Sequence, residues 1–213
     1  CLDMIMNQCN YSDIELQKLI IRWTANEKAE NIQRELDFVC KTPYSVLRIE
    51  SGNFKPKPYY YENKDEGICV FGNPIINERI DGKGTAQSYL AKEANKTFLQ
   101  SLNGEFLIVH FDKCKNVITV VNDRFTSIPF YYYCRNGALI GSFAYNDLWL
   151  ILQQMEVLEV LNESFFEMLW LRRLLGTKTL DKHSSFLPAA HYLVYDGNTV
   201  LLNPYWCPDY TKD

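Results

Sequence analysis

The chain has 213 residues, of which 47% are hydrophobic and 14% aromatic, and its 22 basic and 26 acidic side chains give a net charge of −4. This composition excludes an intrinsically disordered chain, because apolar residues are plentiful and the net charge is small. A slightly acidic chain also lacks the cationic surface that binds a phosphate backbone, so we expect no nucleic-acid partner. No linker-like stretch divides the sequence, and we expect one domain over residues 1–213.

The cysteines indicate neither a zinc site nor a disulfide scaffold. There are seven, at positions 1, 9, 40, 69, 114, 134 and 207, and no two form a CxxC pair. We therefore expect no metal, no cofactor and a reducing compartment. No apolar run reaches the length that spans a bilayer and no signal peptide is visible, so a cytoplasmic protein without a membrane partner is expected.

The N-terminal part is predicted to be helical. Ser12, with Glu15 three residues later, has the spacing of a capping box, and apolar residues continue on roughly one face as far as Trp23. This predicts a helix over Ser12–Phe38 within a divergent helical region, residues 1–43. The remaining residues, 44–213, are predicted to be rich in β-structure.

The rest of the chain predicts strands at Ser45–Ile49 and Gly67–Phe71, then hairpins and two helices. Turn residues such as Asn136–Gly137 favour tight hairpins. The predicted hairpins are Phe106–Phe111 with Val117–Val121, Ile128–Cys134 with Ala138–Phe143, and His191–Tyr195 with Thr199–Leu202; the helices are Tyr145–Leu152 and Ser164–Leu174. This order of elements predicts an α+β fold.

Short motifs follow one another through the second half of the chain. They are Leu102–Phe106, Asn122–Arg124 with Ile128–Tyr132, Gly141–Phe143, Thr179–Leu180, Phe186–Pro188 with Ala190–Leu193, and Tyr205–Trp206. Their order resembles the N-terminal glutaminase-type domain of asparagine synthetases and relatives, the class II glutamine amidotransferases. In that family the patterns are L-x-G-x-F-A, D-R-x-G-x-x-P-L-Y-Y, F-x-S-E, T-x-F, L-P-P-G-H and Y-W. The resemblance covers about residues 67 to 208.

The resemblance implies an N-terminal-nucleophile (Ntn) hydrolase fold, a four-layer αββα sandwich of two mainly antiparallel sheets. Such domains hydrolyse glutamine to glutamate and ammonia, and pass the ammonia to a synthetase domain that activates a carboxylate with ATP. The synthetase domain carries an S-G-G-x-D-S phosphate-binding loop, which these 213 residues lack. Glutamine is thus the implied substrate and a synthetase domain or subunit the implied partner; a homodimer is compatible with this interpretation.

Cys1 is the candidate nucleophile. An N-terminal cysteine combines a thiol with an α-amine whose unperturbed pKa of about 7.7–8.0 suits a general base. Attack on the glutamine amide would give a thioester and release ammonia. The family's nucleophile opens C-G-I, whereas Leu2 and Asp3 follow Cys1 here.

The other candidate site residues follow from the resemblance. The family's N-G-E segment supplies the oxyanion hole, and its counterpart is Phe71–Gly72–Asn73, which places Gly72 and Asn73 at that site. The family's R-G-P-D motif has no match, and Arg48 is the nearest basic candidate for the substrate carboxylate. Asp81 is the candidate for the substrate amine, although the D-S/T-E pattern is absent.

Four polar residues are interpreted as structural rather than catalytic. Asp123 and Arg124 are expected to form a buried bidentate ion pair that fixes the turn into the strand at Pro129. His110 at a strand end and His191 within a strand are interpreted as core or surface histidines rather than catalytic bases.

Two functions stay open. The first is an amidotransferase domain that uses Cys1. The second is a degenerate domain that keeps the fold and acts as an interaction module for an ATP-dependent amide-forming domain, as in relatives within β-lactam synthetases and lasso-peptide cyclases.

Overall fold

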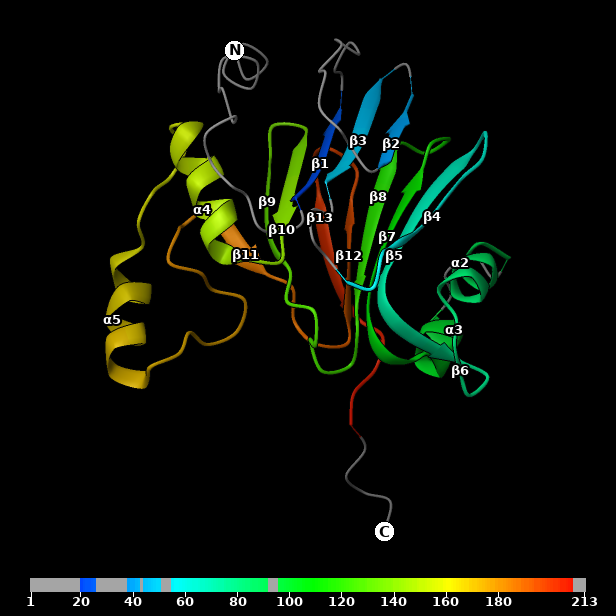
Figure 1. The fold of residues 1–213 in the computed structure, drawn as a ribbon. Helices are drawn as coiled ribbons and strands as arrows, with labels where there is room; N and C mark the ends of the chain where they lie inside the picture. Colours follow the sequence, from blue (N-terminus) through cyan, green and yellow to red (C-terminus); the bar gives the residue numbers. More distant parts are fainter. Residues whose placement is uncertain (1–19, 26–37, 43, 51–54, 92–95, 209–213) are drawn as a thin grey trace. The chain divides into compact units, whose positions relative to one another are not determined.

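The computed structural model describes residues 20–25, 38–42, 44–50, 55–91 and 96–208 (Figure 1). These residues form two compact units, and each unit combines two separate stretches of chain. Unit 1 comprises residues up to Phe54 together with Pro129–Phe186, and unit 2 comprises Lys55–Ile128 together with Leu187 onward. Neither unit therefore corresponds to a continuous segment of sequence.

Unit 1 is built on a six-stranded sheet in which every neighbouring pair is antiparallel. Across the sheet the order is β11-β9-β10-β1-β3-β2. The strands are β1 (Ile20–Ala25), β2 (Phe38–Lys41), β3 (Ser45–Glu50), β9 (Tyr131–Arg135), β10 (Ala138–Ser142) and β11 (Ser184–Phe186).

Two helices belong to unit 1. Helix α4 (Tyr145–Gln154) packs against β9 and β10, and its Leu148, Ile151 and Leu152 join Tyr133 and Ile140 in a buried cluster (Figure 1). Helix α5 (Asn162–Leu171) buries only Ser164. The burial of apolar side chains on one face stabilises helix α4 against the sheet. Helix α5, in contrast, leaves most of its apolar side chains exposed.

The predicted N-terminal helix is wrong over the part that the structure describes. Ile20–Ala25 is a strand that pairs with both β3 and β10, and Phe38 begins β2. The run Ile-Ile-Arg-Trp-Thr is rich in β-branched and aromatic residues, which favour strands, and short apolar runs fit either period. The other residues of the predicted helix lie outside the described part of the chain.

Unit 2 is built on a seven-stranded sheet whose pairs are also all antiparallel. The order is β13-β12-β8-β7-β5-β4, with β6 pairing to β5. The strands are β4 (Tyr59–Glu62), β5 (Glu66–Ile76), β6 (Arg79–Ile80), β7 (Asn103–Asp112), β8 (Val117–Asn122), β12 (His191–Tyr195) and β13 (Val200–Pro204).

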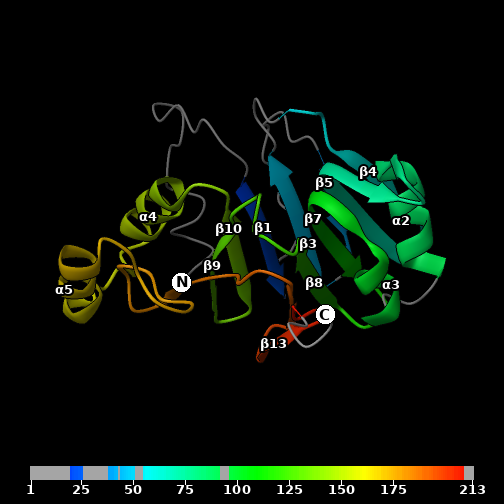
Figure 2. The ribbon, with the colours of Figure 1, turned by 90° about the horizontal axis from the view of Figure 1, so that it is seen from below.

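Two further helices, α2 (Gly82–Ala91) and α3 (Lys96–Ser101), lie beside β5 in unit 2 (Figures 1 and 2). They cover one face of the sheet, where their side chains meet those of β5, β7 and β8. The buried core there includes Val70, Ala86, Tyr89, Phe98, Leu99, Phe106 and Ile108. The sequence did not predict these two helices, although it placed Phe106 in a strand.

The three predicted hairpins are present, as β7–β8, β9–β10 and β12–β13. In the second, Asn136 and Gly137 both have positive φ, the conformation that a type I′ turn requires. The predicted α+β class with mainly antiparallel sheets is therefore confirmed. No helix among the described residues is both long enough and apolar enough to cross a lipid bilayer.

Candidate functional site

The structure describes four of the five predicted site residues. Gly72 and Asn73 lie in β5, and Asp81 follows β6 in the same unit. Arg48 lies in β3 of unit 1. Cys1 lies outside the described residues. The structure thus brings three candidates together in unit 2.

Gly72 and Asn73 occupy a distorted part of the β5–β7 ladder. In this ladder Gly72 faces Phe106, Asn73 faces Glu105, and Pro74 faces Gly104. Both glycines have positive φ, +80° at Gly72 and +87° at Gly104. The Asn73–Glu105 pair therefore lies between two glycines in the left-handed region.

Each glycine makes room for a carbonyl of that pair. A Cβ on Gly72 would overlap the Glu105 carbonyl oxygen, and a Cβ on Gly104 would overlap the Asn73 carbonyl oxygen. Glycine inside a strand commonly marks a close backbone approach, and local distortions of strands are frequent next to active sites. Glu105 was not among the predicted site residues, and its position opposite Asn73 is seen only in the strand pairing.

Asp81 caps helix α2. Its Oδ1 accepts a 2.7 Å hydrogen bond from the Gly84 backbone N–H, and its own N–H donates to the Pro74 carbonyl oxygen at 3.0 Å. The first bond satisfies one of the free donors at the start of the helix. The second ties the cap to the end of β5, two residues after Gly72. Asp81 therefore has a structural role near the predicted oxyanion segment.

Arg48 lies in the interior of the unit 1 sheet. Its side chain is 8% exposed, and its backbone is paired with Arg22 on one side and Val39 on the other. A buried guanidinium needs hydrogen-bond partners for its several N–H donors.

Three of the motif segments that carried the family resemblance meet in a hydrogen-bonded network in unit 2: Asn122–Arg124, the segment around Leu187–Ala190, and Tyr205–Trp206. Tyr205 donates from its hydroxyl to the Asn122 carbonyl oxygen at 2.7 Å, and from its N–H to the Ala190 carbonyl oxygen at 2.9 Å. Ala190 donates to the Asp123 carbonyl oxygen at 2.8 Å, and Asn122 Nδ2 donates to the Leu187 carbonyl oxygen at 3.1 Å. Residues that are up to 83 positions apart are thereby joined.

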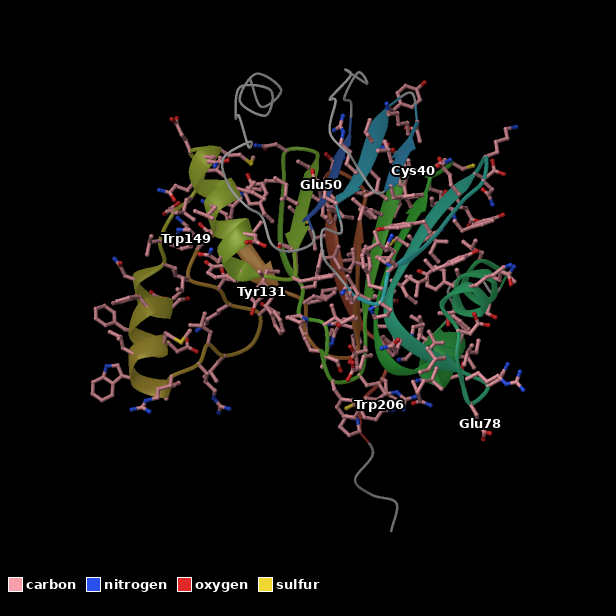
Figure 3. The ribbon with its side chains drawn as sticks, viewed as in Figure 1. Cys40, Glu50, Glu78, Tyr131, Trp149 and Trp206 are labelled. Atoms are coloured by element: carbon pink, nitrogen blue, oxygen red, sulfur yellow. The ribbon has the colours of Figure 1, made fainter. Side chains whose placement is uncertain are left out.

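Asp123 and Arg124 act separately, and the predicted ion pair between them is wrong. The Asp123 carboxylate accepts from the backbone N–H groups of Phe125 at 2.8 Å and Ser127 at 3.0 Å, which holds the turn that follows β8. Arg124 instead donates from Nη2 to the Gln100 carbonyl oxygen at 2.6 Å. Its guanidinium also lies 5.1 Å from the ring centroid of Trp206, which Figure 3 labels. An aspartate can satisfy nearby backbone donors without a cation, and an arginine can stack on an aromatic ring.

The surroundings of two described cysteines, Cys114 and Cys134, disfavour a reactive thiolate. Cys40 and Cys69 are buried, whereas Cys114 and Cys207 are exposed. Burial raises the pKa of Cys134, and desolvation together with the nearby Asp65 carboxylate raises the pKa of Cys114. A raised pKa disfavours the thiolate, which is the nucleophilic form. Within the described part of the chain, no group of three potential metal ligands is present.

Comparison with known proteins gives one family and two weak structural likenesses. No curated protein sequence matches the chain. Among solved structures, glutamine phosphoribosylpyrophosphate amidotransferase from B. subtilis, complexed with ADP and GMP, has 10% identity and a TM-score of 0.49. A structure described as the allosteric regulatory enzyme of purine biosynthesis has 9% identity and a TM-score of 0.47. Each likeness covers 90% of this chain but only 44% of the other, so the chain spans less than half the length of those proteins.

The family profile described as "Glutamine amidotransferase domain" matches residues 87–206, which is more than half of the chain. This range contains every strand of the β7–β8, β9–β10 and β12–β13 hairpins and the whole Asn122–Tyr205 network. The chain therefore belongs to the glutamine amidotransferase domain family.

Proposed function

We propose that this protein hydrolyses glutamine to glutamate and ammonia, with Cys1 as the nucleophile and the segment around Gly72 and Asn73 as the oxyanion site. The observation that carries the proposal is the pair of left-handed glycines, Gly72 and Gly104, around the Asn73–Glu105 pair in a member of this family. A close backbone approach of this kind is suited to a segment whose polar groups must lie at a fixed position beside a reacting atom.

The proposed reaction has two steps. The Cys1 thiol gives its proton to the α-amine and its sulfur attacks the amide carbon of glutamine. The tetrahedral oxyanion, held by donors from the Gly72–Asn73 segment, collapses to a thioester, and the amide nitrogen leaves as ammonia after it takes up the proton. Water then attacks the thioester, which releases glutamate and returns the thiol.

Glutamate release from glutamine tests this proposal. We expect the intact chain, with Cys1 as its first residue, to release glutamate, and the Cys1→Ala variant to lose that activity. Cys114→Ala is the matched control, because Cys114 is exposed and its pKa is raised, and it should keep the full rate. Equal rates for the intact chain and Cys1→Ala would contradict the proposal.

Arg48 and Asp81 are proposed to hold the substrate. A guanidinium at position 48 would pair with the α-carboxylate of glutamine, and a carboxylate at position 81 would pair with its α-ammonium. Arg48→Lys should therefore raise KM more than it lowers kcat, because lysine keeps the charge but not the bidentate geometry. An unchanged KM in Arg48→Lys would contradict the proposed contact with the substrate carboxylate.

The ammonia is proposed to serve a synthetase domain of the asparagine synthetase type, in the cytoplasm. The surface of helix α5 favours a protein partner, because three of its large apolar side chains are exposed. These are Phe166, Leu169 and Trp170, with exposed fractions of 59%, 62% and 85%. Exposed apolar residues grouped in this way commonly mark interaction surfaces. The full reading frame and its neighbours are the test: a segment with an S-G-G-x-D-S loop in the same or an adjacent frame supports this role, and its absence from both contradicts it.

A further inference from the structure

Unit 2 contains a pocket of about 510 Å³ between one face of its sheet and the helices α2 and α3. The sheet strands β5, β7, β8 and β12 form its floor, and Tyr89, Leu90 and Leu99 reach it from the helices. Its volume lies within the range of about 300–1,000 Å³ that is usual for small-molecule sites. All of its described lining residues belong to unit 2, and Arg48, Gly72, Asn73 and Asp81 are not among them.

Three polar side chains that line the pocket lie close together. Glu66 comes from β5, His110 from β7 and Tyr89 from α2, and the rings of Tyr89 and His110 lie 5.2 Å apart between centroids. The Tyr89 hydroxyl and His110 Nε2 are both buried and have no hydrogen-bond partner within the described chain. A buried polar atom without a partner is costly and is rare in native proteins, which suggests a ligand or water as the missing partner.

Glu66 supplies a carboxylate whose charge is not balanced inside the pocket. Its Oε1 lies 3.4 Å from His110 Nε2, a long contact. Burial lowers the pKa of His110 and is the largest influence on it. The imidazole is therefore mostly neutral near pH 7. The other carboxylate, Asp112, lies 3.1 Å from Lys115 Nζ and forms its own ion pair. The pocket therefore keeps one net negative charge at Glu66.

Apart from Asp112, Lys115 and Thr119, the remaining side chains that line the pocket are apolar or aromatic. Val117 and Val121 of β8 and Val194 of β12 face it together with Leu90 and Leu99. The aromatic side chains of Tyr89 and Tyr192 also line it, and aromatic faces attract organic cations. A ligand that suits these walls has a compact apolar body next to its charged group.

We propose that this pocket binds a small primary ammonium compound with an apolar body. An ammonium carries three N–H donors, and the pocket offers three acceptors for them: the Glu66 carboxylate, the neutral His110 nitrogen and the Tyr89 hydroxyl oxygen. One positive charge balances the one net negative charge. The inference is independent of glutamine hydrolysis, because it uses none of the residues assigned to that reaction.

Calorimetric titration of the full chain with 2-phenylethylamine tests the proposal. We expect a dissociation constant below about 1 mM, which is reasonable for a ligand of this size. The neutral analogue 2-phenylethanol and the anion phenylacetate should bind at least tenfold more weakly, because neither supplies a cation to Glu66. Methylamine should also bind at least tenfold more weakly, because it lacks the apolar body.

Variants separate this site from nonspecific binding. Glu66→Gln should weaken 2-phenylethylamine binding by about tenfold or more, whereas Glu78→Gln, which removes an exposed carboxylate elsewhere in unit 2, should leave it unchanged. Tyr89→Phe should weaken binding by about fivefold without lowering the melting temperature, because the hydroxyl it removes has no partner in the protein. No binding by the unmodified chain, or equal affinities in Glu66→Gln and Glu78→Gln, would overturn the proposal.

Discussion

The hydroxyl of Tyr205 donates a 2.7 Å hydrogen bond to the carbonyl oxygen of Asn122, a residue 83 positions earlier in the chain. Both residues are fully buried, and both lie within residues 87–206, the range that matches the glutamine amidotransferase domain family. The contact gives a physical reason for a tyrosine at position 205. Its phenol hydroxyl donates a hydrogen bond to the buried carbonyl oxygen, whereas an aliphatic side chain of similar size has no donor.

Tyr205→Phe should therefore destabilise the protein. The substitution keeps the ring but removes the donor to the Asn122 carbonyl, and we expect the free energy of unfolding to fall by about 1–3 kcal/mol. Urea denaturation measures it. Tyr61→Phe is the matched control, because Tyr61 is 39% exposed. The loss of its hydroxyl should change the free energy of unfolding by less than about 0.5 kcal/mol. Equal effects of the two substitutions would show that the buried bond contributes nothing.

The Asp123 carboxylate should contribute still more. Asp123→Ala leaves the N–H groups of Phe125 and Ser127 without their acceptor, and we expect a loss of at least about 2 kcal/mol of stability. Ser127→Ala removes only the 3.3 Å contact of the hydroxyl with Oδ1 and should cost less than about 1 kcal/mol. A larger effect at Ser127 than at Asp123 would mean that the backbone bonds do not hold this turn.

Substitutions at Gly72 and Gly176 can separate two effects on stability. One is steric overlap with a neighbouring strand, and the other is the cost of a left-handed backbone for a residue with a Cβ. The φ values of the two glycines are similar, +80° and +68°, but a Cβ on Gly176 meets no atom of the described residues within 4 Å. Gly176→Ala should cost about 1 kcal/mol for the conformation alone. Gly72→Ala adds the overlap with the Glu105 carbonyl oxygen and should cost at least about 2 kcal/mol more. Thermal or urea unfolding measures both, and similar values for the two variants would contradict the overlap.

His110 should make stability depend on pH. Burial lowers the pKa of His110 in the folded state, while Lys115 acts in the same direction and Glu66 and Asp112 oppose it. The folded state thus binds the proton less readily than the unfolded state, so stability is full above about pH 6.5, the unfolded pKa, and is lost as the pH falls toward the folded value.

The slope of unfolding free energy against pH, measured by urea denaturation between about pH 7.5 and pH 5.5, tests this dependence. His110→Gln cannot titrate, so its slope in that range should be smaller. His191→Gln is the control, because His191 is only partly buried. An unchanged slope in His110→Gln would contradict the effect.

Much of the β-structure could be predicted from local sequence. Asn136–Gly137 marks a tight turn because both residues tolerate positive φ, and they connect β9 to β10 as expected. The runs that flank this turn and the other two hairpins are apolar or aromatic and pair with their neighbours in the chain. Local pairing leaves a local signal, which is why these elements were predicted.

Elements that depend on distant partners were predicted less well. Ile20–Ala25 became a strand because β3 and β10 pair with it on either side, and β10 lies more than 100 residues later. Helix α2 has polar residues and glycine in its first turn, and it is stabilised by Asp81 at its cap and by Ala86 and Tyr89 in the core. Neither stabilising contact is visible as a periodic apolar pattern.

The candidate site also combines features with a local sequence signal and features that depend on distant residues. Gly72 could be selected from its motif, but the need for glycine there comes from Glu105 on the neighbouring strand. His110 was interpreted as a core or surface histidine, and only the structure brings it together with Glu66 and Tyr89. A pocket formed by residues from six elements leaves no characteristic spacing in the sequence.

The division of each unit between two distant stretches has a consequence for synthesis on the ribosome. Unit 2 lacks β12, β13 and Tyr205 until the last part of the chain has been translated, although its other strands emerge much earlier. During that interval the edge of β8 has no neighbour and its backbone groups are open to other chains. Nascent chains halted before residue 187 should therefore depend on chaperones more than the completed protein does.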